Sequence, residues 1–105
     1  MDEKNSSFDK KILEQIVKMI IEHKKPEKVL IYGSRARGVF KEISDIDIAI
    51  FSKDWTSTDI NLIKHQLDEN IKTPLKIDIV NFYQLKKENL RKNILKEGRI
   101  LYERD

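Results

Sequence analysis

The sequence predicts a small α/β (α+β) fold, in which a mixed β-sheet of three to four strands has helices packed on it. Stretches with apolar residues at helical spacing alternate along the 105 residues with short runs rich in β-branched residues. Hydrophobic residues make up 39% of the chain, which is enough to fill one core, and three glycines and two prolines leave no room for a linker. We therefore expect residues 1–105 to form a single domain.

Three segments are predicted helices. Apolar residues in segment 9–25 recur at a spacing that places them on one side of a helix. Thr56 and Asp59 have the spacing of a capping box, with Trp55 and Ile60 at the positions of a hydrophobic staple, so a second helix is expected to begin there. The last helix is expected to end at Gly98, acting as the C′ glycine that commonly follows a helix.

Four segments are predicted strands. Residues 28–32 form an apolar run that stops at Gly33, and residues 45–52 and 75–80 alternate isoleucine with polar residues. Residues 99–103 are expected to add a short edge strand. Because a helix joins the second and third strands, these two should be parallel neighbours, and the first two strands could pair antiparallel.

Composition and charge exclude several classes of protein. The absence of cysteine excludes a disulfide scaffold, a thiol nucleophile and a zinc ribbon. The formal net charge is only +3, which is weak support for a nucleic-acid partner, and we do not expect one. No apolar run approaches the roughly 20 residues of a membrane span, and the N-terminus has no secretion signal. We therefore expect a cytoplasmic protein.

Three aspartates carry the strongest chemical signal. Asp45 and Asp47 are separated by one residue on a predicted strand, so their carboxylates project from the same face. A lone Asp-x-Asp usually lines the wet face of an amphipathic sheet. Here Asp78, on the polar side of the next strand, can supply a third carboxylate, and repulsion between such groups is relieved by a divalent cation such as Mg²⁺.

A second chemical signal follows the first predicted strand, in the loop Gly33-Ser34-Arg35-Ala36-Arg37-Gly38. The glycine permits close backbone approach, and Ser34 offers a hydroxyl and an amide where a helix is expected to start, a place that attracts phosphate. The two arginines provide cationic donors that match phosphate oxygens. By itself such a sequence is most often an ordinary loop, but its position next to the aspartate pair predicts a phosphate cradle.

These residues together carry a family resemblance. Gly33-Ser34, ten further residues and Asp45-Ile46-Asp47 resemble the Gly-Ser-x10-Asp-x-Asp signature of the polymerase-β-like nucleotidyltransferase superfamily. Gly-Ser-Arg-Ala-Arg-Gly and Ser-Asp-Ile-Asp are similar to the motifs of its minimal, MNT-type members. The resemblance covers most of the chain, including the Leu-Arg-x-x-Ile-Leu-x-Glu-Gly stretch at residues 90–98. The loop at residues 39–43 departs from the loop common in relatives, although the spacing is intact.

The resemblance implies an enzyme that transfers a nucleoside monophosphate, AMP from ATP, to a hydroxyl of a protein partner or small acceptor. In this interpretation Asp45, Asp47 and Asp78 are catalytic and hold two Mg²⁺ ions, Asp78 either ligating the catalytic ion or helping to deprotonate the acceptor. Gly33 and Ser34 would bind the β- and γ-phosphates of the nucleotide. Arg35 and Arg37 are further candidates for contact with the triphosphate, and of the two we assign Arg37 to nucleotide binding.

The resemblance also implies a partner. Minimal relatives are commonly paired with a helical HEPN-type protein, for which they act as the antitoxin by adenylylating a tyrosine of the toxin. The alternative is a non-catalytic binding module that neutralises or scaffolds such a partner by contact alone. The oligomeric state stays open, although the edge strand at 99–103 offers a pairing surface for a second copy.

Two aromatic residues have simpler expected roles. His23 lies off the apolar stripe of the first helix and is expected to be a surface histidine. Trp55 is expected to pack as a hydrophobic staple rather than to stack on a nucleotide base.

Overall fold

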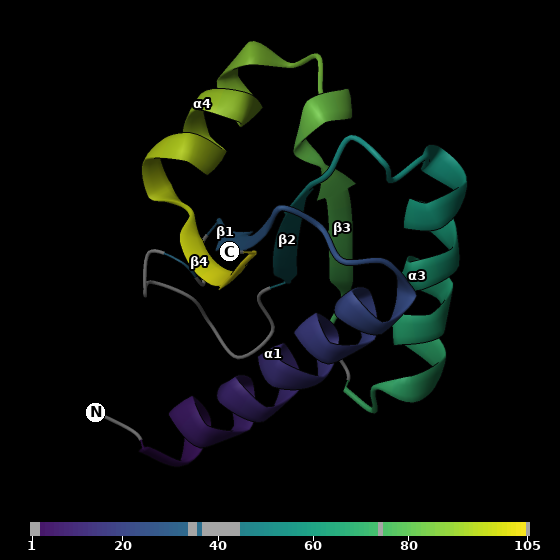
Figure 1. Ribbon diagram of the computed structural model, residues 1–105. Coiled ribbons are helices and arrows are strands. Elements are labelled where there is room, and N and C mark those ends of the chain that lie inside the picture. The colour runs from purple at the N-terminus through teal and green to yellow at the C-terminus, as the bar shows by residue number, and fades with distance from the viewer. Residues whose placement is uncertain (1–2, 34–35, 37–44, 74, 105) are drawn as a thin grey trace.

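A four-stranded mixed sheet with helices on both faces forms the fold, as predicted. The computed structural model describes residues 3–33, 36, 45–73 and 75–104, and the strands lie in the order β3-β2-β1-β4 (Figure 1). The strands are β1 (Lys28–Tyr32), β2 (Ile46–Phe51), β3 (Ile77–Asn81) and β4 (Arg99–Glu103). The helical elements are α1 (Glu3–His23), α3 (Ser57–Asn70), the 3₁₀ turn η1 (Phe82–Gln84) and α4 (Glu88–Glu97).

Strand pairing brings three strand ends together at one end of the sheet. β1 pairs antiparallel with β2 and with β4, and β2 pairs parallel with β3, so both predicted directions and the predicted edge strand are confirmed. The parallel pair arises because α3 carries the chain back along the sheet between β2 and β3. The C-terminal end of β1 therefore lies beside the N-terminal ends of β2 and β3.

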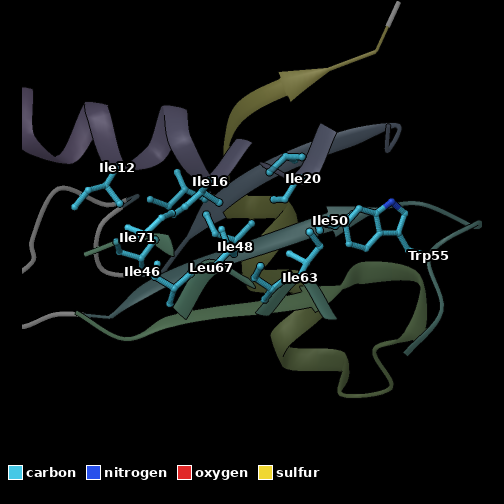
Figure 2. Packing of buried hydrophobic residues seen from close by; sticks show 14 of the residues in the cluster. Ile12, Ile16, Ile20, Ile46, Ile48, Ile50, Trp55, Ile63, Leu67 and Ile71 are labelled. Atoms are coloured by element: carbon cyan, nitrogen blue, oxygen red, sulfur yellow. The ribbon is translucent and has the colours of Figure 1, made fainter. Parts of the chain in front are cut away.

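The larger core lies between the sheet and helices α1 and α3. The isoleucines of β2, at alternate positions, face this side together with side chains from both helices (Figure 2). Ile16, Ile48 and Ile63 are fully buried there, one each from α1, β2 and α3. Because burial of such side chains contributes about 1.5–3 kcal/mol each, this layer fixes the positions of the strands relative to one another.

The opposite face of the sheet is covered by α4 and η1. Ile94 of α4 and Phe82 of η1 are buried against Leu30 and Phe51 of the strands. The rings of Phe51 and Phe82 stack with centroids 4.4 Å apart, and the Arg91 guanidinium lies over Phe82 and donates hydrogen bonds to the Phe82 and Leu85 carbonyl oxygens. The apolar cover is thus concentrated toward the C-terminal end of β2.

The C-terminus of α1 is fastened to the N-terminus of α3. Trp55 is almost fully buried and donates its indole N–H to the Lys24 carbonyl oxygen at 2.9 Å. His23 packs edge-on against Trp55 and lies 2.9 Å from a carboxylate oxygen of Asp59. The structural role of Trp55 is confirmed, but the expectation of a surface histidine at 23 is wrong, because α3 begins beside this residue.

The start of α1 and the conformation of the glycine that ends α4 differ from the sequence-based expectations. Helix α1 begins at Glu3, before residue 9, where polar residues give no apolar stripe to detect. Gly98 does not adopt the left-handed conformation of a C′ glycine, since its φ is −65° and the chain runs directly into β4. Glycine is required there for space, because a Cβ atom would collide with the Ile94 carbonyl oxygen and lie 2.9 Å from the Leu30 side chain.

No helix within the described ranges is both long enough and apolar enough to cross a membrane.

Replacement of the N-cap of α3 should destabilise the protein. The Thr56 hydroxyl accepts a hydrogen bond from the Asp59 backbone N–H, and the Asp59 carboxylate accepts one from the Thr56 N–H, which completes the predicted capping box. We expect Thr56→Ala to lower the free energy of unfolding by about 1 kcal/mol, measured by urea denaturation. Thr58→Ala, an exposed position in the first turn, is the matched control, and an equal loss in both variants would contradict this role.

The stability contributed by Asp59 should depend on pH. The Thr56 backbone N–H, and then the His23 ring, hold the pKa of Asp59 well below its ordinary value. A carboxylate with a depressed folded-state pKa stabilises the protein above its unfolded-state pKa of about 3.9, and this contribution is lost as the pH falls toward the folded-state value. Asp59→Asn should therefore cost most stability at pH 7 and progressively less below about pH 4.

Denaturation of the wild type and Asp59→Asn at a series of pH values measures this difference. Asp68→Asn, at an exposed position of the same helix, controls for the lost charge. A difference in unfolding free energy that stayed constant from pH 7 to pH 2 would show that Asp59 does not act through its ionised form.

Candidate active site

Three polar side chains form a row across the sheet, here called the polar row: Tyr32, Asp47 and Asp78. Tyr32 is the register partner of Asp47 on the antiparallel neighbour, and Asp47 is the register partner of Asp78 on the parallel neighbour. The alternation that sends Ile46 and Ile48 into the larger core sends Asp47 to the opposite face. The polar row therefore lies on the face that carries α4, at the end of the sheet where β2 and β3 begin.

Asp47, the centre of the polar row, is a partly buried carboxylate with like charges around it. Its burial, then Asp78 and then Asp45, raise the pKa of Asp47 above its ordinary value, while Lys76 opposes the shift. Within the described ranges, no residue donates a hydrogen bond to the Asp47 carboxylate or forms an ion pair with it. The ionised form of a partly buried carboxylate without such a partner is stabilised by any cation that approaches it.

Tyr32 was not identified from the sequence, although it belongs to the same row. Burial, followed by the charges of Asp47 and Asp78, raises the pKa of the Tyr32 phenol to about 12. The phenol is therefore protonated at neutral pH and can donate a hydrogen bond. It could have been found only by predicting the antiparallel register of the first two strands, which places Tyr32, the residue before Gly33, opposite Asp47.

Gly33 lies directly against the Asp47 carboxylate. Its φ of +79° belongs to the left-handed region, and a Cβ atom built on it would be 2.7 Å from Asp47 Oδ2. The Ala36 N–H donates to the Gly33 carbonyl oxygen at 3.1 Å, so the chain turns immediately after β1. The other predicted members of the phosphate cradle, Ser34 and Arg37, lie outside the described residues, as does Arg35.

The remaining two carboxylates are placed differently. Asp45 is exposed and immediately precedes β2. Asp78 is partly exposed, and its Oδ1 atom is 3.1 Å from the Lys64 ammonium of α3. Within residues 3–33, 36, 45–73 and 75–104, no three acidic or imidazole groups converge in a way that would hold a metal ion. The structure thus brings Asp47 and Asp78 together, with Asp45 close enough to influence Asp47, but turns Asp78 toward a lysine.

The donor chemistry of the polar row fits a hard divalent cation. Mg²⁺ is typically held by one or two carboxylates, with waters and substrate phosphates as its other ligands, so a preformed cage of three protein groups is not needed. Asp47 and Asp78 on adjacent strands are such a pair, and the charge of Asp78, after burial, raises the pKa of Asp47, an effect that a cation would oppose. Gly33 leaves space beside the Asp47 oxygen that a larger residue would fill.

Comparison with known proteins places the chain in a family. The family described as "Polymerase beta, Nucleotidyltransferase" matches residues 14–105, which is most of the chain. The chain belongs to the polymerase beta nucleotidyltransferase family. Its mixed sheet with helices on both faces is accordingly the core of this family, as the sequence resemblance implied. No protein of curated function matches the chain.

Solved structures share the nucleotidyltransferase fold at low sequence identity. One chain of a toxin–antitoxin crystallised with AMP-PNP has a TM-score of 0.73 and 20% identity, with 88% of this chain and 73% of that chain covered. A mutant of the toxin–antitoxin MntA–HpeT has a TM-score of 0.71 and 17% identity, with 88% of this chain and 73% of that chain covered. The crystal structure of a "putative nucleotidyltransferase" from Sulfolobus solfataricus has a TM-score of 0.60 and 24% identity, with 90% of this chain and 79% of that chain covered.

Substitution of Gly33 should disturb both the backbone and Asp47. We expect Gly33→Ala to lower the free energy of unfolding by about 1–3 kcal/mol, because alanine is strained at a φ of +79° and its methyl group would meet the Asp47 carboxylate. In the Asp47→Ala background the cost should be smaller, because only the backbone strain remains. Equal costs in the two backgrounds, measured by urea denaturation, would show that Gly33 and Asp47 are not in contact.

Proposed function

We propose that this protein transfers a nucleoside monophosphate, AMP from ATP, to a hydroxyl group of an acceptor in an Mg²⁺-dependent reaction. The observation that carries the proposal is the register pairing of Asp47 and Asp78 beside Gly33, in a chain of the nucleotidyltransferase family. The arrangement provides two carboxylates for a cation next to a strand-to-turn junction where a nucleotide phosphate can approach the backbone closely.

Each residue of the proposed site has a separate task. Asp45 and Asp47 would hold two Mg²⁺ ions, with Asp78 as the third ligand or as the group that accepts the acceptor proton. When bound, the ions would neutralise the triphosphate and stabilise the charge that develops on the attacking and leaving oxygens. Gly33 and Ser34 would bind the β- and γ-phosphates, with Arg37 as a further contact.

The reaction balances without any other cofactor. The acceptor oxygen forms a bond to the α-phosphorus of ATP while the bond between that phosphorus and the bridging oxygen of pyrophosphate breaks. The acceptor proton passes to a carboxylate or to solvent, and pyrophosphate leaves with the electron pair of the broken bond. The Tyr32 hydroxyl, protonated at neutral pH, can donate a hydrogen bond on the same face of the sheet.

A protein hydroxyl is the acceptor we propose, and a helical toxin of the HEPN type is the proposed partner. The support is that chains of two toxin–antitoxin structures share this fold, one of them crystallised with AMP-PNP. The MntA–HpeT mutant carries two aspartate-to-glutamate changes separated by one residue, which is also the spacing of Asp45 and Asp47. In this proposal the protein acts as an antitoxin by modifying its partner in the cytoplasm.

Loss of the Asp47 carboxylate should abolish transfer without unfolding the protein. The acceptor in this assay is the proposed HEPN-type partner, taken as the product of the neighbouring gene. We expect Asp47→Asn to reduce transfer of label from α-³²P-ATP to this protein by on the order of 100-fold or more. Because the pKa of Asp47 is raised in the folded state, its ionised form costs stability at neutral pH, so Asp47→Asn should be at least as stable as the wild type at pH 7. Thermal denaturation checks this second expectation.

Asp68→Asn, an exposed carboxylate of α3, is the matched control and should retain full activity. Labelling that survives Asp47→Asn would overturn the catalytic assignment. Absence of label in the wild type, together with tight binding of the neighbouring gene product, would favour the alternative of a non-catalytic binding module.

A further inference from the structure

Lys64 is the charged residue that reaches the polar row from a helix. Helix α3 lies alongside β3, the strand at one edge of the sheet (Figure 1). It buries Ile63 and Leu67 in the larger core. The next residue after Ile63 is Lys64, whose ammonium nitrogen is 3.1 Å from Asp78 Oδ1. The position of Lys64 is thus set by the packing of α3, and its partner is a candidate ligand of the proposed metal site.

We propose that Lys64 holds Asp78 away from Asp47 in the nucleotide-free protein, so that the carboxylate site assembles only when a divalent cation displaces the lysine. This inference rests on the proposed function, because it concerns the same carboxylates. Lys64 is then a positioning residue that acts through Asp78.

The repulsion between two carboxylates is the reason that a lysine at Asp78 matters. Asp47 and Asp78 are register partners on adjacent strands, where two carboxylates repel one another. A lysine on Asp78 supplies positive charge beside this pair when no metal is bound.

The strength of the Lys64–Asp78 pair suits displacement. The side chains of Lys64 and Asp78 are 40% and 36% exposed, and ion pairs of such exposure contribute little to stability. A divalent cation held by Asp47 and Asp78 would be attracted by both carboxylates and would carry twice the charge of the ammonium, so this attraction would exceed that of the lysine. The lysine therefore competes with the metal without excluding it.

The test is direct measurement of Mn²⁺ affinity, with Mn²⁺ alone as the probe and free Mn²⁺ quantified by electron paramagnetic resonance. We expect Lys64→Ala and Lys64→Met to bind Mn²⁺ about two- to five-fold more tightly than the wild type, because a competing cation has been removed. Lys64→Arg should retain the wild-type affinity. Lys72→Ala, an exposed lysine just beyond α3, controls for the change in net charge.

The partner of Lys64 is tested in the Asp78→Asn background, where Lys64→Ala should have no effect on Mn²⁺ affinity. Thermal denaturation establishes that each variant is folded. If the wild type binds Mn²⁺ and Lys64→Ala binds it with the same or lower affinity, this inference is overturned and the proposed function stays intact. A folded wild type that binds no Mn²⁺, even with a non-hydrolysable ATP analogue present, would overturn both proposals.

Discussion

The register of three strands is the constraint on which the candidate site depends. Tyr32, Asp47 and Asp78 stand in one row only because β1 and β2 pair antiparallel while β2 and β3 pair parallel. Two carboxylates on adjacent strands repel one another, and a shift by one residue would relieve the repulsion but would also turn the β2 isoleucines out of the core. Burial of those isoleucines is worth more than the repulsion costs, so the hydrophobic layer on one face keeps the backbone positions of Asp47 and Asp78 side by side on the other.

The fold was predictable because its elements are locally encoded. Isoleucine alternation marks β2 and β3, and the capping box at Thr56 marks the start of α3, so each boundary depends on neighbouring residues in the sequence. Gly98 was misinterpreted because a glycine at a helix end can serve two purposes. Its conformation is ordinary, and its lack of a side chain matters because α4 and β4 meet the Leu30 side chain at that point.

The site was predictable only in part, because some of its contacts join residues that are distant in the chain. Asp47 and Asp78, which the structure brings into register, were proposed from residue type and spacing, as was the exposed Asp45. Tyr32 and Lys64 were not, since Tyr32 joins the row through strand register, and Lys64 reaches Asp78 through the packing of α3. His23 was missed for the same reason, because Asp59 is 36 residues away and meets it only after α1 and α3 pack together.

The two edges of the sheet differ in chemistry, which bears on where an acceptor can approach. At the β4 edge, pairing with β1 is irregular beside Val29 and Leu30, and Arg99 and Glu103 place charges at the two ends of the strand. Irregular pairing and charged residues are features that disfavour the addition of another strand, even though Ile100 is exposed there. The opposite edge carries Asp78, beside the carboxylate of Asp47. In the proposed reaction, an acceptor hydroxyl would react at the end of the sheet where β2 and β3 begin, and a partner bound along β4 would lie on the far side of β1 from Asp47 and Asp78.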